Sequence, residues 1–252
     1  MIIRIKGVIK RFRFRQDLAD GVRDSLPIAF GYFAVSFAYG LYAVAGGLPP
    51  LTAALISLTN LTSAGQFAGT GLIFMHAPYL EIAMTTLLIN LRYMLMSLSL
   101  SQRIRPDMGV LPRLMIGYGM TDEIYAVAIH RPGELGKGYL MALIALPALF
   151  WTGGTLAGGL AGSILPPALR SALGIALYAM FVAIVMPTAR RSRPVCVVAL
   201  LAAALSLACT SLPGLNGLAA GWRIIVCTVL AAAVGALIAP VRSDESAGTE
   251  EQ

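Results

Sequence analysis

The chain has 252 residues, of which 58% are hydrophobic and only 12% are charged. A soluble domain averages about 25% charged residues, so this composition excludes a soluble globular protein and predicts a surface covered largely by lipid. The formal net charge of +7 does not indicate nucleic acid binding, because the basic residues cluster at the ends of apolar runs, where they act as topology signals. We therefore expect an all-α integral membrane protein.

The N-terminal segment is basic. Residues 1–24 carry seven Arg or Lys side chains and are predicted to lie in the cytoplasm. The apolar run that follows, 26–46, is longer than the roughly 7–15 apolar residues of a secretory signal, so we expect a retained first helix. No charged residue occurs between Asp24 and Glu81, and this stretch is long enough for two bilayer crossings of about 20 residues each.

Eight apolar runs follow one another along the chain, separated by proline and glycine, which punctuate helical segments. They cover residues 26–46, 51–75, 79–101, 111–130, 138–162, 168–189, 194–212 and 220–239. Two of them are poor spanning candidates, because 51–75 is polar at its centre and 111–130 carries Arg113, Asp122 and Glu123. We predict a polytopic helical bundle of about six full spans plus two broken or re-entrant segments.

Charge placement determines the predicted topology. If neither polar run crosses, most of the 19 basic residues face the cytoplasm, as the positive-inside rule favours. This arrangement leaves both termini in the cytoplasm. Residues 25–240 then form the transmembrane transporter domain, and 241–252 form an acidic, disordered tail. The similar lengths of 25–130 and 138–240 are compatible with an internal repeat.

The first polar constellation lies at the centre of run 51–75, where Thr62, Ser63 and Gln66 interrupt the apolar sequence. An unpaired amide in hydrocarbon is costly, so these groups need partners. One interpretation is that they form hydrogen bonds that hold helices together. The other is a solute pathway beside an opened backbone, with Phe67 in its apolar wall.

The second constellation comprises Asn90, Arg92 and Tyr93, in the middle of run 79–101. Polar side chains occur on both faces of this segment, so we expect the helix to be central or shared with a second subunit. An arginine at mid-membrane costs about 2.5–3.5 kcal/mol on insertion scales and needs an anionic partner. Arg92 either forms a structural ion pair with an acid of the next run or binds a carboxylate of the solute, for which a guanidinium is suited.

The third constellation contains two adjacent acids, Asp122 and Glu123, in run 111–130. Neighbouring residues of a helix point in different directions, so one acid can pair with Arg92 while the other remains free. An interior carboxylate can hold a substrate ammonium group or relay protons. A cytoplasmic loop is the alternative interpretation of this segment.

An enzyme is not indicated, because the sequence lacks HExxH and GxSxG motifs and its three cysteines have no metal-ligand spacing. We therefore expect no cofactor. The uncharged, glycine-rich first half would also suit a channel-type pore for small polar solutes, which remains the alternative to a carrier. Small-xxx-small spacings such as Gly154 and Gly158 predict close contact between helices in lipid.

Five short motifs occur in a fixed order along the chain. They are Leu18-Ala-Asp-Gly-Val-Arg-Asp-Ser-Leu-Pro27, Thr62-Ser-Ala-Gly-Gln-Phe-Ala68, Leu87-Leu-Ile-Asn-Leu-Arg-Tyr93, Leu98-Ser-Leu100 and Thr121-Asp-Glu-Ile-Tyr-Ala126. In order and spacing they resemble the AzlC-type branched-chain amino acid permeases, over roughly residues 17–240. The usual Ala-Ala or Ala-Ser of that family before Gly-Gln-Phe is Ser63-Ala64 here.

The resemblance implies export of branched-chain amino acids (leucine, isoleucine and valine, with methionine also in range) across a bacterial cytoplasmic (inner) membrane. It also implies a small AzlD-type membrane partner. We expect a zwitterionic substrate to lie between residues 62–66 and 90–93, with Arg92 or half-helix N-termini at its carboxylate. Asp122 or Glu123 would meet its ammonium group, and proton coupling through one of these acids fits the same chemistry.

Overall fold

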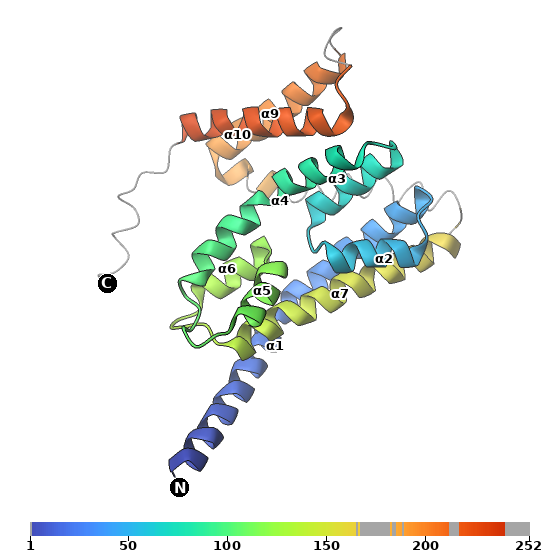
Figure 1. Ribbon diagram of the computed structural model, residues 1–252. Coiled ribbons are helices and arrows are strands. Elements are labelled where there is room, and N and C mark those ends of the chain that lie inside the picture. Colours follow the sequence, from blue (N-terminus) through green and yellow to red (C-terminus); the bar gives the residue numbers. More distant parts are fainter. Residues whose placement is uncertain are drawn as a thin grey trace.

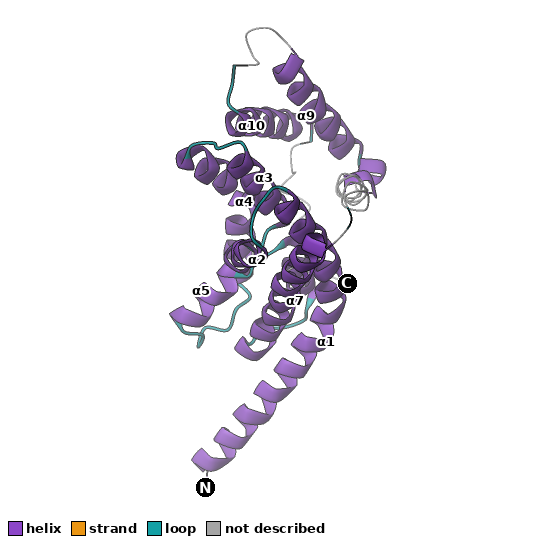
Figure 2. Cartoon of the chain, turned by 90° about the vertical axis from the view of Figure 1, so that its right-hand side faces the viewer, coloured by secondary structure: helices purple, strands orange, loops and turns teal. Residues whose placement is uncertain are grey.

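The computed structural model describes the backbone of residues 2–164, 166, 182, 185–187, 189–211 and 217–239, with side chains for residues 14–162 and for the described ranges that follow 164. Every regular element in these ranges is a helix (Figures 1 and 2). The helices are α1 (Ile2–Ala45), α2 (Pro50–Thr59), α3 (Ser63–Phe74), α4 (Tyr79–Ser101), α5 (Val110–Tyr118), α6 (Asp122–His130), α7 (Lys137–Ile164), α9 (Arg193–Ser211) and α10 (Ala220–Ile238).

Five helical segments are long and apolar enough to cross a membrane. They are Phe14–Ala45, Tyr79–Ser101, Lys137–Gly162, Arg193–Ser211 and Ala220–Ile238. They coincide with five of the six predicted full spans. The sixth predicted span, 168–189, falls largely outside the described residues, and the predicted tail 241–252 falls entirely outside them. The total number of spans, the internal repeat and the cytoplasmic location of both termini stay predictions.

The scaffold is the long parallel pair of α1 and α7, which lie side by side in both views (Figures 1 and 2). Glycine permits this close approach. A methyl group on Gly158 would collide with the carbonyl of Phe37, and one on Gly40 would collide with the carbonyl of Thr155. Lipid is as apolar as the helix surfaces, so the hydrophobic effect does not drive helices together there. Close backbone contact instead lets membrane helices gain van der Waals packing energy. The close contact predicted from the spacing of Gly154 and Gly158 is confirmed.

The run 51–75 is broken, as predicted. Pro50 begins α2 at a position that tolerates its missing N–H, and Asn60 ends the helix with φ −140°. The chain stays extended through Thr62, which has φ −126° and ψ 120°, before α3 begins at Ser63. Two half-helices therefore replace one span, and the break lies at the polar residues that the sequence analysis singled out.

The run 111–130 is broken in the same way, as predicted. Gly119 ends α5, and Thr121 adopts an extended conformation with φ −138° and ψ 169° before α6 begins at Asp122. Ile116, Ile124 and their neighbours form part of an apolar cluster with Leu140 and Leu143 of α7. The two half-helices are thus packed into the bundle, which is required for irregular backbone at membrane depth.

Helix α4 connects the two broken segments and the hairpin formed by α9 and α10. Its polar residues face three different neighbours, whereas Leu87, Leu95 and Leu98 remain 60–65% exposed. Glu81 is buried and accepts a hydrogen bond from the N–H of Gly221, in the first turn of α10, where a negative charge is favourable. The helix therefore has one apolar face open to lipid, and its polar side chains face the neighbouring helices.

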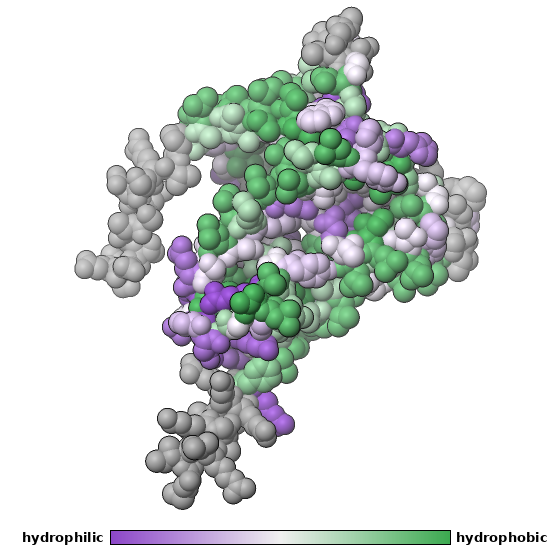
Figure 3. All heavy atoms as spheres, viewed as in Figure 1, coloured by the Kyte–Doolittle hydropathy of each residue, from purple (hydrophilic) through white to green (hydrophobic). Residues whose placement is uncertain are grey.

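The outer surface is mainly apolar. In Figure 3 hydrophobic residues cover most of the visible face, and hydrophilic residues gather near the loops beside α5 and α6 and toward the middle. Large apolar side chains such as Leu111, Leu200 and Leu237 are 66–82% exposed. Exposed apolar area on this scale is unfavourable in water and is the expected outer surface of a membrane protein.

Candidate functional site

A cavity of about 630 Å³ lies where both broken segments meet α1, α4 and α7. Its volume falls within the range of about 300–1,000 Å³ that is typical of small-molecule sites. Its polar wall contains Ser63, Arg92, Tyr93, Asp122 and Glu123. Its apolar wall is contributed by α1, by the break before α3 and by α7, through Pro27, Ile28, Val35, Leu61, Ala64 and Trp151.

The first turns of α3 and α6 both line this cavity. Neither N-cap threonine, Thr62 or Thr121, forms a side-chain cap hydrogen bond. The first backbone bond into α3 is donated by the N–H of Gln66 to the carbonyl of Thr62, at 3.0 Å, so the preceding amides have no partner within the helix. The buried hydroxyl of Ser63 also has no hydrogen-bond partner. Free amides at a helix N-terminus attract an anion.

Arg92 bridges the two broken segments from α4. Its Nη1 lies 2.8 Å from Oδ2 of Asp122, and its Nη2 donates to the Tyr93 hydroxyl at 3.0 Å. The Tyr93 hydroxyl in turn donates to Thr62 at 3.2 Å. The side chains of Arg92 and Asp122 are 47% and 37% exposed, so a ligand in the cavity can reach the pair. Of the acids considered as partners for Arg92, Asp122 forms the ion pair.

Glu123 is held by a residue of α1. The Tyr32 hydroxyl lies 2.7 Å from Oε2 of Glu123 and 2.6 Å from the hydroxyl of Thr121. A carboxylate only accepts, so Tyr32 donates its single proton to Glu123 and accepts the hydrogen bond of Thr121. The two adjacent acids therefore have different partners, one a guanidinium and the other a phenol.

Gln66 lies behind the cavity wall, in a buried network. Its amide donates to the hydroxyl of Ser57, and its carbonyl oxygen accepts from Nε1 of Trp151 at 3.0 Å. The hydroxyls of Ser57 and Thr155 are 2.6 Å apart. These contacts join α2, α3 and α7, which is the helix-to-helix hydrogen bonding that the sequence analysis considered for this glutamine.

The nine predicted site residues thus divide into two groups. Five line the cavity, namely Ser63, Arg92, Tyr93, Asp122 and Glu123. Four lie outside its lining: Thr62 and Gln66 are buried behind it, Phe67 packs edge-on against Tyr39 with ring centroids 5.1 Å apart, and Asn90 donates to Asn60 at 3.4 Å. Direct contact of any of the nine with a substrate stays a prediction.

Sequence reasoning missed two aromatic residues of the site, Tyr32 and Trp151. Their rings are in edge contact, with centroids 5.2 Å apart. Each stands next to a phenylalanine, Phe33 or Phe150, within a long apolar run, and an aromatic in such a run looks the same whether it faces lipid or a cavity. The available signal was Pro27, which lies inside α1 near this level and removes a backbone hydrogen bond there.

A metal centre is not indicated, since no group of three or more His, Cys, Asp or Glu side chains is placed to hold a metal ion among the described residues. The arrangement instead offers one cation, two carboxylates and two helix N-termini around an apolar chamber. Such a site can hold a small molecule that carries both charges and an apolar side chain.

Comparison with known proteins shows the family. The sequence model of the AzlC protein family matches residues 27–165. The inner membrane protein YgaZ of Escherichia coli (strain K12) is 30% identical over 194 residues, which are 74% of this chain and 79% of the relative. An uncharacterized membrane protein of Archaeoglobus fulgidus is 31% identical over 170 residues, which are 66% of this chain and 74% of the relative.

No solved structure matches the chain. The family match begins at Pro27, in the wall of the cavity, and covers both broken segments and every charged residue at the site. The relatives are named as membrane proteins, in agreement with the apolar helices and the exposed apolar surface. The chain belongs to the AzlC family of membrane proteins.

Proposed function

We propose that this protein exports small amino acids from the cytoplasm across the bacterial inner membrane. Branched-chain amino acids (leucine, isoleucine and valine) and methionine are the proposed substrates, and a small AzlD-type membrane subunit is the proposed partner. Membership of the AzlC family supports a transport role, and the inner-membrane name of the Escherichia coli relative supports the location.

The observation that carries the proposal is the convergence of opposite charges and apolar surface in one cavity. A free amino acid has a carboxylate and an ammonium group on one carbon. The carboxylate would be met by Arg92, the Ser63 hydroxyl and the free amides at the start of α3. The ammonium would be met by Asp122 and Glu123 at the start of α6.

The substrate side chain determines the rest of the fit. Ile28, Val35, Leu61 and Trp151 provide the apolar wall, and a branched aliphatic chain buried there would gain about 1.5–3 kcal/mol from leaving water. A longer polar side chain would find no hydrogen-bonding partner on that wall. Size and polarity together favour aliphatic amino acids over charged ones.

Arg92 and Asp122 also suggest how the site can change state. The two side chains neutralise each other at 2.8 Å. A zwitterion inserted between them would pair with both, so the ion pair between the broken segments would be exchanged for two contacts with the substrate. Protonation of Asp122 or Glu123 would weaken the hold on the ammonium group, which is the proposed route of proton coupling.

The test is leucine efflux from cells and proteoliposomes containing the full chain with its AzlD-type partner. Wild type is expected to show saturable efflux and counterflow, and Arg92→Gln is expected to reduce both at least about tenfold, since a charge-assisted hydrogen bond contributes about 1.5–3 kcal/mol. Arg223→Gln, on α10 and outside the cavity lining, is the matched control. Unchanged efflux by Arg92→Gln would contradict the proposed site.

The same assay separates a carrier from a pore. A carrier saturates and exchanges labelled for unlabelled leucine, whereas a pore gives flux that rises linearly with concentration and shows no counterflow. Linear flux would favour the channel-type alternative.

A further inference from the structure

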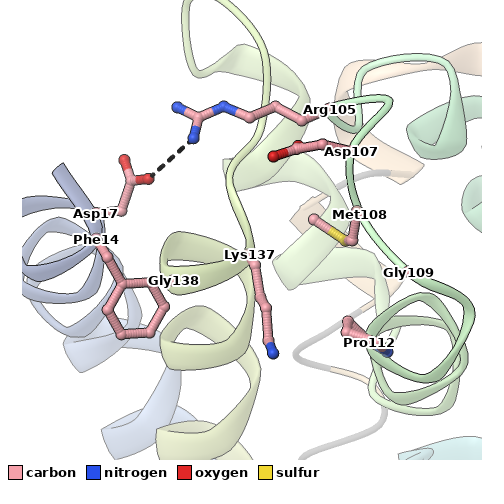
Figure 4. A pocket seen from close by; sticks show the side chains of 9 residues that line it. All are labelled: Phe14, Asp17, Arg105, Asp107, Met108, Gly109, Pro112, Lys137 and Gly138. Atoms are coloured by element: carbon pink, nitrogen blue, oxygen red, sulfur yellow. Dashed lines mark ion pairs between the residues drawn. The ribbon is translucent and has the colours of Figure 1, made fainter. Parts of the chain in front are cut away.

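A second cavity, of about 410 Å³, lies nearer the N-terminus of α1, beside Phe14 and Asp17 (Figure 4). It is enclosed by the exposed turns of α1 before the bundle, the loop between α4 and α5, the start of α5 and the start of α7. It shares no lining residue with the cavity between the broken segments. Asp17 and Gly31 are 14 positions apart on α1, which places the two cavities about 20 Å apart.

Charges of both signs line this second cavity. Asp17 and Asp107 contribute carboxylates, and Arg105 and Lys137 contribute cations. In Figure 4 the guanidinium of Arg105 points toward Asp17, but Nη1 and Oδ2 are 3.7 Å apart, which exceeds hydrogen-bond length. Neither Asp107 nor Lys137 has an ion pair or side-chain hydrogen bond among the described side chains.

The walls are shaped by glycine and by apolar side chains. A methyl group on Gly136 would collide with the carboxylate of Asp17, and one on Gly138 would come within 3.0 Å of the Phe14 ring. These two glycines therefore let the start of α7 lie against α1. Phe14, next to Asp17 on α1, and Met108 and Pro112, on the side of Asp107, add apolar side chains between the charged groups of the lining.

We propose that this cavity is a second binding site for a free α-amino acid with an apolar side chain. It passes the bound amino acid on to the cavity between the broken segments. The inference rests on the proposed function and specifies where substrate is first captured. Lys137 and Arg105 would bind the carboxylate, and Asp107 and Asp17 would bind the ammonium group.

The charge composition favours this ligand over a phosphate. Two carboxylates beside the two cations would repel a polyanion, whereas a zwitterion presents one charge of each sign at the spacing of a single carbon atom. The apolar side chain of the ligand would lie against Phe14 and Met108, which removes apolar area from water. Lys137 is then the residue whose loss affects binding most directly, because it has no partner to release among the side chains that the structure describes.

The experiment measures equilibrium binding of radiolabelled leucine to the full chain in phosphatidylcholine nanodiscs. Wild type is expected to bind two leucine molecules per chain, and Lys137→Met combined with Asp107→Asn is expected to bind one. Lys137→Arg should keep two, with an affinity within about tenfold of wild type, since the charge is retained. Glu134→Gln, at an exposed position of the neighbouring loop outside the cavity lining, is the matched control and should also keep two.

Leucine binding in the cavity between the broken segments is tested separately with Arg92→Gln. A wild-type stoichiometry of one that Arg92→Gln removes and Lys137→Met leaves unchanged would overturn the second site while the proposed function stands. Loss of all binding in the Lys137→Met and Asp107→Asn variant would also overturn it, because the sites would then not be independent. Unchanged leucine binding accompanied by loss of copurifying phosphatidylethanolamine would assign the cavity to lipid and overturn the proposal. Wild-type binding and efflux in Arg92→Gln would instead contradict the proposed function.

Discussion

The buried network around Gln66 allows a sharp test of the division between cavity and scaffold. Gln66 is 1% exposed and forms two side-chain hydrogen bonds, one with Ser57 and one with Trp151. Gln66→Ala removes both bonds and leaves the indole N–H of Trp151 without its acceptor. Hydrogen bonds inside membrane proteins average about 0.6 kcal/mol and reach about 1.7 kcal/mol, so the loss should be about 1–3.5 kcal/mol.

That loss converts to a fall in Tm of about 2–14 °C, since 1 kcal/mol shifts Tm by about 2–4 °C in a chain of roughly this size. The assay is thermal unfolding of the full chain in detergent, run beside leucine efflux normalised to folded protein. We expect the lower Tm with an apparent KM for leucine changed less than about threefold, which corresponds to under about 0.7 kcal/mol. Ser57→Ala also removes two side-chain hydrogen bonds, one with Gln66 and one with Thr155, and should lower Tm by a similar amount.

The opposite pattern would refute this reasoning. If Gln66→Ala kept the wild-type Tm and raised the apparent KM for leucine tenfold or more, Gln66 would be a substrate ligand. A double variant of Ser57→Ala and Gln66→Ala gives a further check. Residues that share a hydrogen bond should show a combined loss of stability smaller than the sum of the single losses.

Three other changes test the packing and the site. Gly158→Leu should abolish folded protein on gel filtration, because its side chain would meet backbone of α1, whereas Gly153→Leu, which has open space, should elute as wild type. Gly221→Ala should displace α10 from α4 and lower Tm by about 2–4 °C per kcal/mol lost, and Gly217→Ala, also in open space, should leave Tm unchanged. Tyr32→Phe removes the proton donated to Glu123 and should lower leucine efflux up to about tenfold, with normal protein yield. This is the effect of losing one hydrogen bond of about 1.4 kcal/mol. Wild-type efflux by this variant would contradict the role of Tyr32.

Much of the architecture follows from the sequence. Long apolar runs separated by proline and glycine predict the helices, since backbone groups in lipid must be satisfied within a segment. The polar centres of 51–75 and 111–130 predict the two breaks, because such residues are costly on a lipid-facing helix. Arg92 at mid-membrane needs an anion, and the sequence offers Asp122 and Glu123 of the next run as its partners in the protein, beside a carboxylate of the solute.

Tertiary structure alone decided what each polar group does. Ser63 and Gln66 are three positions apart on α3 and equally polar in sequence, yet Ser63 lines the cavity and Gln66 bonds to Ser57 and Trp151 behind it. Residues three positions apart lie on the same face of a helix, so the difference depends on what surrounds each turn: the first turn of α3 borders the cavity, and the next turn packs against Ser57 and Trp151. Tyr32 entered the site for the same reason, since nothing local distinguishes an aromatic facing lipid from one facing a carboxylate. The sequence determines that buried polar groups need partners, and only packing between helices distant in the chain determines which partners they find.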